Sequence, residues 1–332
     1  MEEEKFISVI IPTYNQGPSL LNCINALKDQ TYTKSSYEII IINDGSTDET
    51  DVLVKSAINK YASYCTIVYL YQQRKGPAAA RNLGIKHAQG TIIASIDSDC
   101  IAIKTWLEEI TKWYSDSRLA GVGGLTKPLI TSSIINEYCS HIRLNDEPYI
   151  NRTGIEYIIT GNASFRKEYL ILVGLFDERY TFPGGEDPEL CYRLKKAGYY
   201  FQYNKNAVVF NPHKQTLYPL LKTYYHYGKG GSFLHLSTCS VWSLTTNTHL
   251  KFNYYFIKAL CRAIIIIFDC MVGSILDIVK FPLKTLLRYG NGLSLRSSLF
   301  FSLLDNAIVL SYRIGMLAGY WEGKRKGIEK ST

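Results

Sequence analysis

The sequence predicts an α/β protein with a mostly parallel central sheet, followed by a helical appendage at the C-terminus. Apolar strand patterns alternate with helical patterns over the first hundred residues, and polar residues collect where the strands end. Long apolar runs with basic flanks fill the last third of the chain. With 332 residues, 46% of them hydrophobic, the chain can bury the core of one large domain and carry an appendage.

Four runs rich in β-branched residues predict strands, and those at 6–12, 37–44 and 91–97 are expected to be buried. Three segments between them are expected to be helices. Strand, helix and strand in this order indicate right-handed crossovers and parallel pairing. Ser46 or Thr47 is expected to cap the second helix. The expected strands are 6–12, 37–44, 66–71 and 91–97, and the expected helices are 18–30, 47–60 and 77–88.

After residue 100 the pattern loosens. A helix is expected at 104–115 and a strand at 120–130. Residues 157–180 read as strand, turn and helix, and residues 182–210 as a helix followed by a strand. The Gly- and Lys-containing segment 224–233 is expected to be a loop.

The ends of the strands carry the chemistry, because ligands of such sheets bind at the carboxyl ends of the strands. These ends read "PTYN" (12–15), "NDGS" (43–46) and "DSD" (97–99). Asp97 and Asp99 repel each other, so a positive partner is expected there. The alternative is a pair of solvated acids in a turn. No GxGxxG follows the first strand and no GxxxxGK[ST] is present, so a dinucleotide site and a P-loop lack support.

Charge is distributed unevenly along the chain. From residue 201 onward there are 16 Lys and Arg against 5 Asp and Glu, whereas residues 1–200 hold 21 against 24. The basic third flanks the apolar runs 259–281 and 299–321, which favours a membrane surface over nucleic acid as a partner.

The cysteines and the N-terminus indicate a cytosolic setting. The eight cysteines are scattered without a CxxC pair, so neither a zinc site nor a disulfide framework is expected, and reduced thiols are the simplest reading. The opening "MEEEKF" has no apolar stretch of the kind found in secretory signals.

Five motifs in order, "SVIIPTYN", "IIINDGSTDET", "KGPAAARNLGI", "SIDSDC" and "GGEDPELCYRL", resemble the family 2 glycosyltransferases of the membrane-associated bacterial and archaeal type. The resemblance covers roughly residues 6–230 and implies the GT-A fold. It implies a glycosyltransferase domain at 1–230, with a nucleotide-binding half (1–100) and an acceptor half (101–230). Residues 231–332 would then form a helical, basic, membrane-associating region.

For the donor, the resemblance implies that Asp97 contacts the ribose or sugar and that Asp99 ligates Mn²⁺ or Mg²⁺ bridging two phosphates. His213 would be a further metal ligand, unless it is a bystander. Arg81 would bind phosphate oxygens, or else pair with a neighbouring acid as a surface residue. The implied donor-binding set is Pro12, Thr13, Tyr14, Asn15, Asp44, Gly45, Ser46, Lys75, Gly76, Arg81, Asp97 and Ser98.

For the acceptor, the resemblance implies that Asp187 is the general base and that Glu186 orients the acceptor or the site. Asp187 precedes Pro188, so the alternative is that it is only a helix N-cap. Arg193 can pair with Glu189 at i,i+4 or reach the site acids. The residues expected to line the acceptor side are Gly161, Asn162, Gly185 and Arg193.

The resulting hypothesis is an inverting hexosyltransferase that moves a sugar from a nucleotide-sugar, UDP-linked by expectation, to a glycan or lipid-linked acceptor. The protein would be cytoplasmic and peripheral on the inner face of the cell membrane, which it would contact through residues 255–325. Central charges such as Asp269 and Asp305 disfavour spanning helices. Helices that only pack on the enzyme or on a second subunit remain an alternative.

Two rival functions remain. A sugar nucleotidyltransferase would need a Gly-rich, Lys- or Arg-containing loop after the first strand, and "PTYNQGPSL" is not one. A glycan- or lipid-binding scaffold without activity would be expected to have lost one of the three acids Asp97, Asp99 and Asp187. The sequence leaves the sugar, the linkage and the oligomeric state open.

Overall fold

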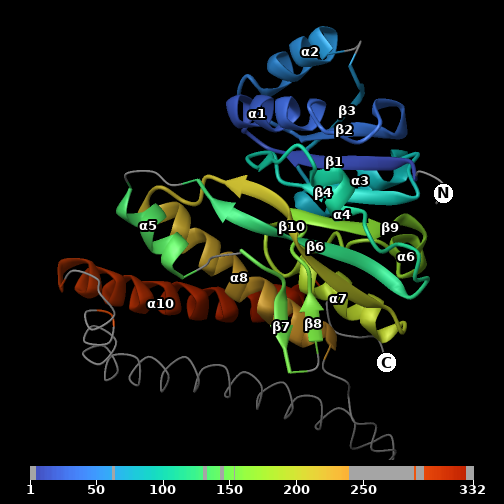
Figure 1. Cartoon of the computed structure of the whole chain (residues 1–332). Helices are drawn as coiled ribbons and strands as arrows, with labels where there is room; N and C mark the ends of the chain where they lie inside the picture. The colour runs from blue at the N-terminus through green and yellow to red at the C-terminus, as the bar shows by residue number, and fades with distance from the viewer. Residues whose placement is uncertain are drawn as a thin grey trace, which may run out of the picture. The chain divides into compact units, whose positions relative to one another are not determined.

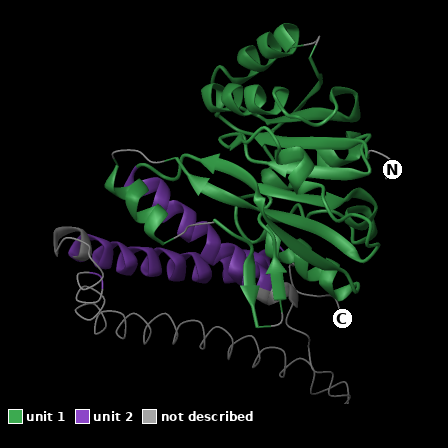
Figure 2. Cartoon of the chain, in the orientation of Figure 1, with its two compact units in different colours: residues 1–215 green, residues 216–332 purple. Residues whose placement is uncertain are grey.

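The computed structural model describes residues 5–61, 64–129, 133–142, 146–152, 154–238, 288 and 295–326 (Figure 1). The chain divides into two compact units, residues 1–215 and residues 216–332 (Figure 2). The boundary lies after Gln215, earlier in the chain than the expected residue 230.

Unit 1 is built on an eight-stranded sheet with strand order β3-β2-β1-β4-β9-β6-β10-β5. Six strands run in one direction, and β9 and β5 run against them. The expected α/β fold with a mostly parallel sheet is therefore confirmed. The strands are β1 (Ile7–Thr13), β2 (Tyr37–Asp44), β3 (Thr66–Gln72), β4 (Ile92–Ile96), β5 (Ile101–Ala102), β6 (Leu119–Pro128), β9 (Asn162–Arg166) and β10 (Tyr200–Asn211), with a separate hairpin of β7 (Tyr149–Asn151) and β8 (Gly154–Tyr157).

Helices cover both faces of the sheet. On one face, Val9 and Ile11 of β1 belong to one buried cluster with Leu20 and Ile24 of α1. On the other face, α3 lies so close that a Cβ on Gly84 would come within 2.7 Å of Ile42 Cδ1. This two-sided burial explains why the parallel strands read as continuous apolar runs. The helices of unit 1 are α1 (Gly17–Lys28), α2 (Thr50–Tyr61), α3 (Pro77–His87), α4 (Trp106–Ile110), α5 (Ile134–His141), α6 (Lys167–Leu172) and α7 (Glu186–Lys196), with a 3₁₀ turn at Lys34–Ser36.

Two sequence-based predictions about helices were wrong in detail. The helix expected at 104–115 is the short α4, and Trp113 has a φ of 68°, which an α-helix does not accommodate. The second helix begins at Thr50, so Ser46 and Thr47 lie too far ahead of it to be the capping residue. Asp48 instead accepts the Thr50 amide at 3.0 Å.

Unit 2 contains two described helices that pack together, α8 (Leu217–Thr238) and α10 (Leu295–Arg325). The prediction of a loop at 224–233 is wrong, because this segment is part of helix α8. A Cβ on Gly228 would overlap the Tyr312 carbonyl oxygen, so this glycine serves close helix contact rather than a turn. The apolar run 299–321 lies in α10, whereas the run 259–281 lies outside the described residues.

Candidate active site

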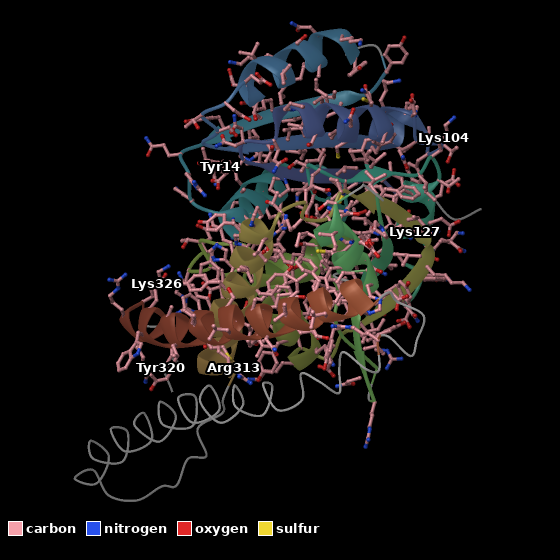
Figure 3. The ribbon with its side chains drawn as sticks, turned by 90° about the vertical axis from the view of Figure 1, so that its left-hand side faces the viewer. Tyr14, Lys104, Lys127, Arg313, Tyr320 and Lys326 are labelled. Atoms are coloured by element: carbon pink, nitrogen blue, oxygen red, sulfur yellow. The ribbon has the colours of Figure 1, made fainter. Side chains whose placement is uncertain are left out.

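The ends of β1, β2 and β4 bring the predicted donor-binding residues to one edge of the sheet. Thr13 pairs with Asn43 in the parallel register, and β4 ends at Ile96, directly before Asp97. Figure 3 shows Tyr14 at this edge. The polar strand ends that were separate in the sequence are thus neighbours in space.

Asp44 is buried at the end of β2 and holds the loop before α3. Its Oδ1 accepts hydrogen bonds from the Lys75 amide at 2.8 Å and Gln72 Nε2 at 2.7 Å, and its Oδ2 accepts the Gly76 amide at 2.9 Å. Gly76 has a φ of 99°, and a Cβ there would lie 2.6 Å from the Thr181 carbonyl oxygen. Asp44 therefore fixes a glycine turn against the acceptor half of unit 1.

The surface beside this turn combines an aromatic ring with cations. The Arg74 guanidinium lies 3.7 Å from the centroid of the Tyr14 ring, a cation–π contact. The Asn15 amide donates to Ser46 Oγ at 2.9 Å, so Ser46 joins the loops after β1 and β2. Pro12 and Thr13 are the last residues of β1, and Thr13 is buried. Gly45 has a φ of 75°, and Lys75 is exposed.

The two aspartates after β4 have different surroundings, with the buried Ser98 between them. The side chain of Asp97 is 45% exposed, and its amide donates to the Gly161 carbonyl at 3.4 Å. Asp99 accepts from Asn211 Nδ2 at 3.0 Å. Burial and the charge of Asp97 raise the pKa of Asp99.

Gly161 lies directly against Asp97. A Cβ at this glycine would approach Asp97 Oδ2 to 2.7 Å, so a larger residue would displace the carboxylate. Gly161, which was expected on the acceptor side, therefore lies against Asp97, which was expected to bind the donor.

Asp187 is held by the residue before Gly161. Its Oδ1 accepts the Thr160 hydroxyl at 2.8 Å and its Oδ2 accepts the Thr160 amide at 3.1 Å. Burial and then the charge of Glu186 raise the pKa of Asp187 to about 7, although Arg81 and Thr160 act in the opposite direction. The N-cap of α7 is Gly185, at a φ of 94°, so the capping alternative for Asp187 is not what the structure adopts.

Arg81 connects the two acidic motifs. Its side chain is buried, with Nη1 3.0 Å from Glu186 Oε1 and Nη2 3.5 Å from Asp97 Oδ1. Glu186 Oε2 also accepts the Gly184 amide at 2.6 Å. Arg81 is thus directed at carboxylates rather than being a surface residue.

Two residues expected to face the acceptor are engaged elsewhere. The Asn162 side chain is buried, accepts from Trp106 Nε1 at 2.8 Å, and donates to the Leu125 and Ala207 carbonyls at 3.0 Å each. It therefore joins strands of the sheet instead of facing the site. Arg193 pairs with Glu189 at 2.6 Å and donates to the carbonyls of residues 173 and 175.

The expected metal ligands lie in different settings. His213 is buried, and its Nε2 lies 3.7 Å from Asp146 Oδ1. Among the residues that the structure describes, no group of three or more His, Cys, Asp or Glu side chains is arranged to hold a metal. Asp99 and Asp97 nonetheless fit a hard cation because they are paired carboxylates, and the positive charge of Lys214 also acts on Asp99.

The sequence did not point to Thr160 or Asn211, which bind the key carboxylates. Each is a polar residue close to one that was expected in the site: Thr160 directly precedes Gly161, and Asn211 lies two residues before His213. Their position near these residues was the available signal, but nothing in the pattern specified their partners.

Comparison with known proteins finds glycosyltransferases. Residues 8–171 match the model of glycosyl transferase family 2. The glycosyltransferase AglE of Haloferax volcanii is 28% identical over 227 residues, which is 68% of this chain and 72% of that one. Chondroitin synthase of Escherichia coli is 27% identical over 62% of this chain, which spans only 34% of that longer protein.

A solved structure shares the fold. A mannosyltransferase of Pyrobaculum calidifontis, in complex with GDP-Man and Mn²⁺, superposes with a TM-score of 0.60 over 100% of this chain and 89% of its own length. The sequence identity is 16%, so this likeness concerns the fold alone.

Proposed function

The chain belongs to glycosyl transferase family 2, and from this premise we propose an inverting glycosyltransferase that takes its sugar from a nucleotide-sugar. The acceptor would be a hydroxyl of a glycan or of a lipid-linked saccharide. One observation carries the proposal: Thr160 holds Asp187 while the next residue, Gly161, abuts Asp97. The expected base and the expected donor-binding acid therefore lie on either side of one turn.

The donor would bind along the strand ends. Asp44 and its glycine turn would shape the site for the base and ribose, with Tyr14 and Ser46 beside them. Asp97 would contact the sugar or ribose. Arg74 and Lys75, which are exposed and cationic, suit the negative charge of a diphosphate. We keep UDP as the expected nucleotide, and GDP is the alternative because the Pyrobaculum calidifontis neighbour holds GDP-Man.

A divalent cation, Mn²⁺ or Mg²⁺, would be held by Asp99, with His213 as a further ligand. When bound, such a cation neutralises negative charge on the departing diphosphate. Among the described residues, the buried Nε2 of His213 makes no hydrogen bond, and its neighbour is Asp146 Oδ1 at 3.7 Å. The Mn²⁺ of the structural neighbour supports the cation, but not the ligand set.

Asp187 would act as the general base. It would accept the proton of the acceptor hydroxyl while the hydroxyl oxygen bonds to the anomeric carbon. The bond between that carbon and the diphosphate oxygen would break, and the leaving group would keep the electron pair. A pKa of about 7 suits this role, because a base works best when its pKa lies near the working pH. Thr160 would keep the carboxylate oriented.

The rival functions predict different behaviour. A nucleotidyltransferase would form a nucleotide-sugar from a nucleoside triphosphate, and a scaffold would bind ligands without turnover. The site favours the transferase, because Asp97, Asp99 and Asp187 are all present and Asp187 has a raised pKa.

We also propose that the protein lies at a membrane surface and is cytoplasmic. Among the described helices, one segment, Leu299–Arg325, is long and apolar enough to cross a bilayer. Only 28% of its most apolar window is buried, which leaves much of it available to lipid. A peripheral position, rather than a span, follows from Asp305 and Arg313 within this helix.

The test is calorimetric binding of UDP and of GDP to the full-length protein and to Asp99→Ala, in Mn²⁺ and then in EDTA. We expect Mn²⁺-dependent binding of one nucleotide that the substitution abolishes. Binding that persists in EDTA and in the variant would remove the metal role of Asp99. No binding of either nucleotide under any condition would overturn the proposal and favour the scaffold.

A further inference from the structure

Arg81 occupies an unusual position for a residue expected at the diphosphate. Only 5% of it is exposed, and its two terminal nitrogens point to acids from different motifs. One is Asp97 after β4, and the other is Glu186 at the start of α7. These motifs are 89 residues apart in the chain, so this guanidinium is a direct link between the donor and acceptor sides.

Negatively charged side chains outnumber positively charged ones around Arg81 and Asp187. Three carboxylates, Asp97, Glu186 and Asp187, surround Arg81, and each favours the charged form of its guanidinium. The charged or titratable groups near Asp187 are Glu186 and Cys191 on α7 and Arg81 on α3, while Thr160 on the adjoining turn donates two hydrogen bonds. Arg81 is the cation among them.

We propose that Arg81 is a positioning residue that keeps Asp187 ionised near neutral pH. It also fixes the position of Asp97, on the donor side, relative to Glu186 and Asp187, on the acceptor side. This inference rests on the proposed role of Asp187 as the base. Without the guanidinium, no cation would oppose the charge of the adjacent Glu186 on Asp187, and the base would retain its proton over more of the working pH range. The consequence is a change in the pH dependence of the site, which a purely structural arginine would not cause.

The neighbouring residue on α3 offers a matched control. Asn82 is as deeply buried as Arg81, donates to the Phe176 carbonyl at 2.9 Å and accepts the Phe176 amide at 2.9 Å. Asn82 therefore fixes α3 to the Phe176 backbone and makes no hydrogen bond to Asp97, Glu186 or Asp187. Asn82→Ala should destabilise the protein while leaving the titration of Asp187 in place.

The experiment uses linkage between protonation and folding, so it needs no known acceptor. Because burial raises the folded pKa of Asp187 above its unfolded value, the folded state binds a proton that the unfolded state releases. Stability relative to Asp187→Asn should thus be highest below the unfolded pKa, decline as the pH rises, and level off above about 7. Denaturant unfolding from pH 4 to 9 measures this difference.

In Arg81→Gln, we expect the levelling-off point to move up by about one to two pH units. In Glu186→Gln it should move down, because a repelling charge is removed. Arg81→Lys should remain close to the parent, and Asn82→Ala should not move it. The pH dependence of nucleotide release from UDP-glucose, UDP-N-acetylglucosamine and GDP-mannose, with water as acceptor, should shift in the same directions.

The outcomes separate the two claims. An unmoved profile in Arg81→Gln would overturn the role of Arg81 even if Asp187 is the base and Glu186→Gln shifts as expected. If Arg81→Gln does not fold, Glu186→Gln alone decides, and an unmoved profile there overturns the inference. Undiminished transfer or hydrolysis by Asp187→Asn would instead overturn the proposed base and leave the electrostatic link intact.

Discussion

At the scale of single residues, the site is defined by short contacts that cross the two motifs. Thr160 binds Asp187, Gly161 leaves room for Asp97, and Arg81 contacts both Asp97 and Glu186. Removing any of these contacts should therefore affect donor and acceptor sides together. The smallest such change is the addition of one methyl group at Gly161.

We expect Gly161→Ala to weaken nucleotide-sugar binding by about tenfold, equivalent to about 1.4 kcal/mol. The added Cβ would lie 2.7 Å from Asp97 Oδ2, and the partly exposed carboxylate would move away from its present position. Because that carboxylate can shift toward solvent, the free energy of unfolding should change little. Calorimetric titration with the nucleotide that binds the parent protein measures the effect.

The background Asp97→Ala supplies the control for this prediction. If the methyl group acts by displacing Asp97, adding Gly161→Ala to Asp97→Ala should weaken binding no further. Additive losses in the double variant would contradict the steric explanation and indicate a separate effect on the turn.

The sequence could predict which residues share this edge of the sheet, but not which groups their side chains would bind. The ends of parallel strands meet by geometry, which is why Tyr14, Asp44 and Asp97 were expected together. The direction of a side chain at a turn depends on tertiary contacts that the pattern does not contain. Asn162 shows the consequence, since it was expected in the site but forms hydrogen bonds to Trp106 and to two strands of the core.

At the scale of elements, the strands of both halves of the sheet were predictable, but the pairing in the second half was not. The strands expected at 120–130, within 157–180 and at the end of 182–210 are β6, β9 and β10. Strands β1, β2 and β4 are buried apolar runs, β3 is a partly exposed edge strand, and local crossovers join all four, so pattern and order determine them. Strand β9 pairs antiparallel with both β4 and β6 although it follows β4 by some seventy residues. Such a pairing depends on register between distant segments, and neither hydrophobic spacing nor turn residues specify it.

The packing of α8 on α10 gives an element-scale prediction. A Cβ at Gly315 would overlap the Tyr225 carbonyl oxygen, and one at Gly228 would overlap the Tyr312 carbonyl oxygen. Backbone atoms cannot move aside as a side chain can, so the helices must separate. We expect Gly315→Ala to lower the free energy of unfolding by about 1–3 kcal/mol, as overpacking does. Denaturant unfolding followed by circular dichroism measures it.

Gly231→Ala on α8 is the matched control. Its new Cβ would meet the Tyr312 hydroxyl at 3.0 Å, the far end of a flexible side chain. Because alanine favours a helix over glycine by about 1 kcal/mol, this variant should be neutral or stabilising. Equal destabilisation by both variants would show that the loss of glycine itself matters, rather than the close approach of the helices.

At the scale of the whole molecule, the excess of positive charge and an exposed apolar helix face occur in the same part of the chain. Residues from 201 onward carry 16 Lys and Arg against 5 Asp and Glu. In α10, five exposed apolar residues recur at intervals of four and seven, which places them on one face of the helix. Arg313 and Tyr320 lie on this helix, and Lys326 directly follows its last residue (Figure 3). The five residues are Leu299, Leu303, Leu310, Ile314 and Trp321.

An apolar helix face with basic residues nearby suits the surface of an anionic bilayer, where apolar burial and attraction to lipid charge act together. We expect the full-length protein to sediment with vesicles of phosphatidylcholine and phosphatidylglycerol, and to bind pure phosphatidylcholine more weakly. Leu310→Asp combined with Ile314→Asp should reduce the bound fraction severalfold. Since both side chains are already exposed, the fold should be preserved.

The control for this prediction is Ile171→Asp on α6 in unit 1, which changes an equally exposed apolar residue outside α10. It should leave vesicle binding unchanged. Raising the salt concentration should release the parent protein, because screening weakens the attraction between exposed charges. A parent protein that stays in the supernatant with anionic vesicles would contradict the membrane proposal. If the double α10 variant also converted a dimer to a monomer, the same face would be the contact with a second copy of the chain, and the basic residues of this region would need another explanation.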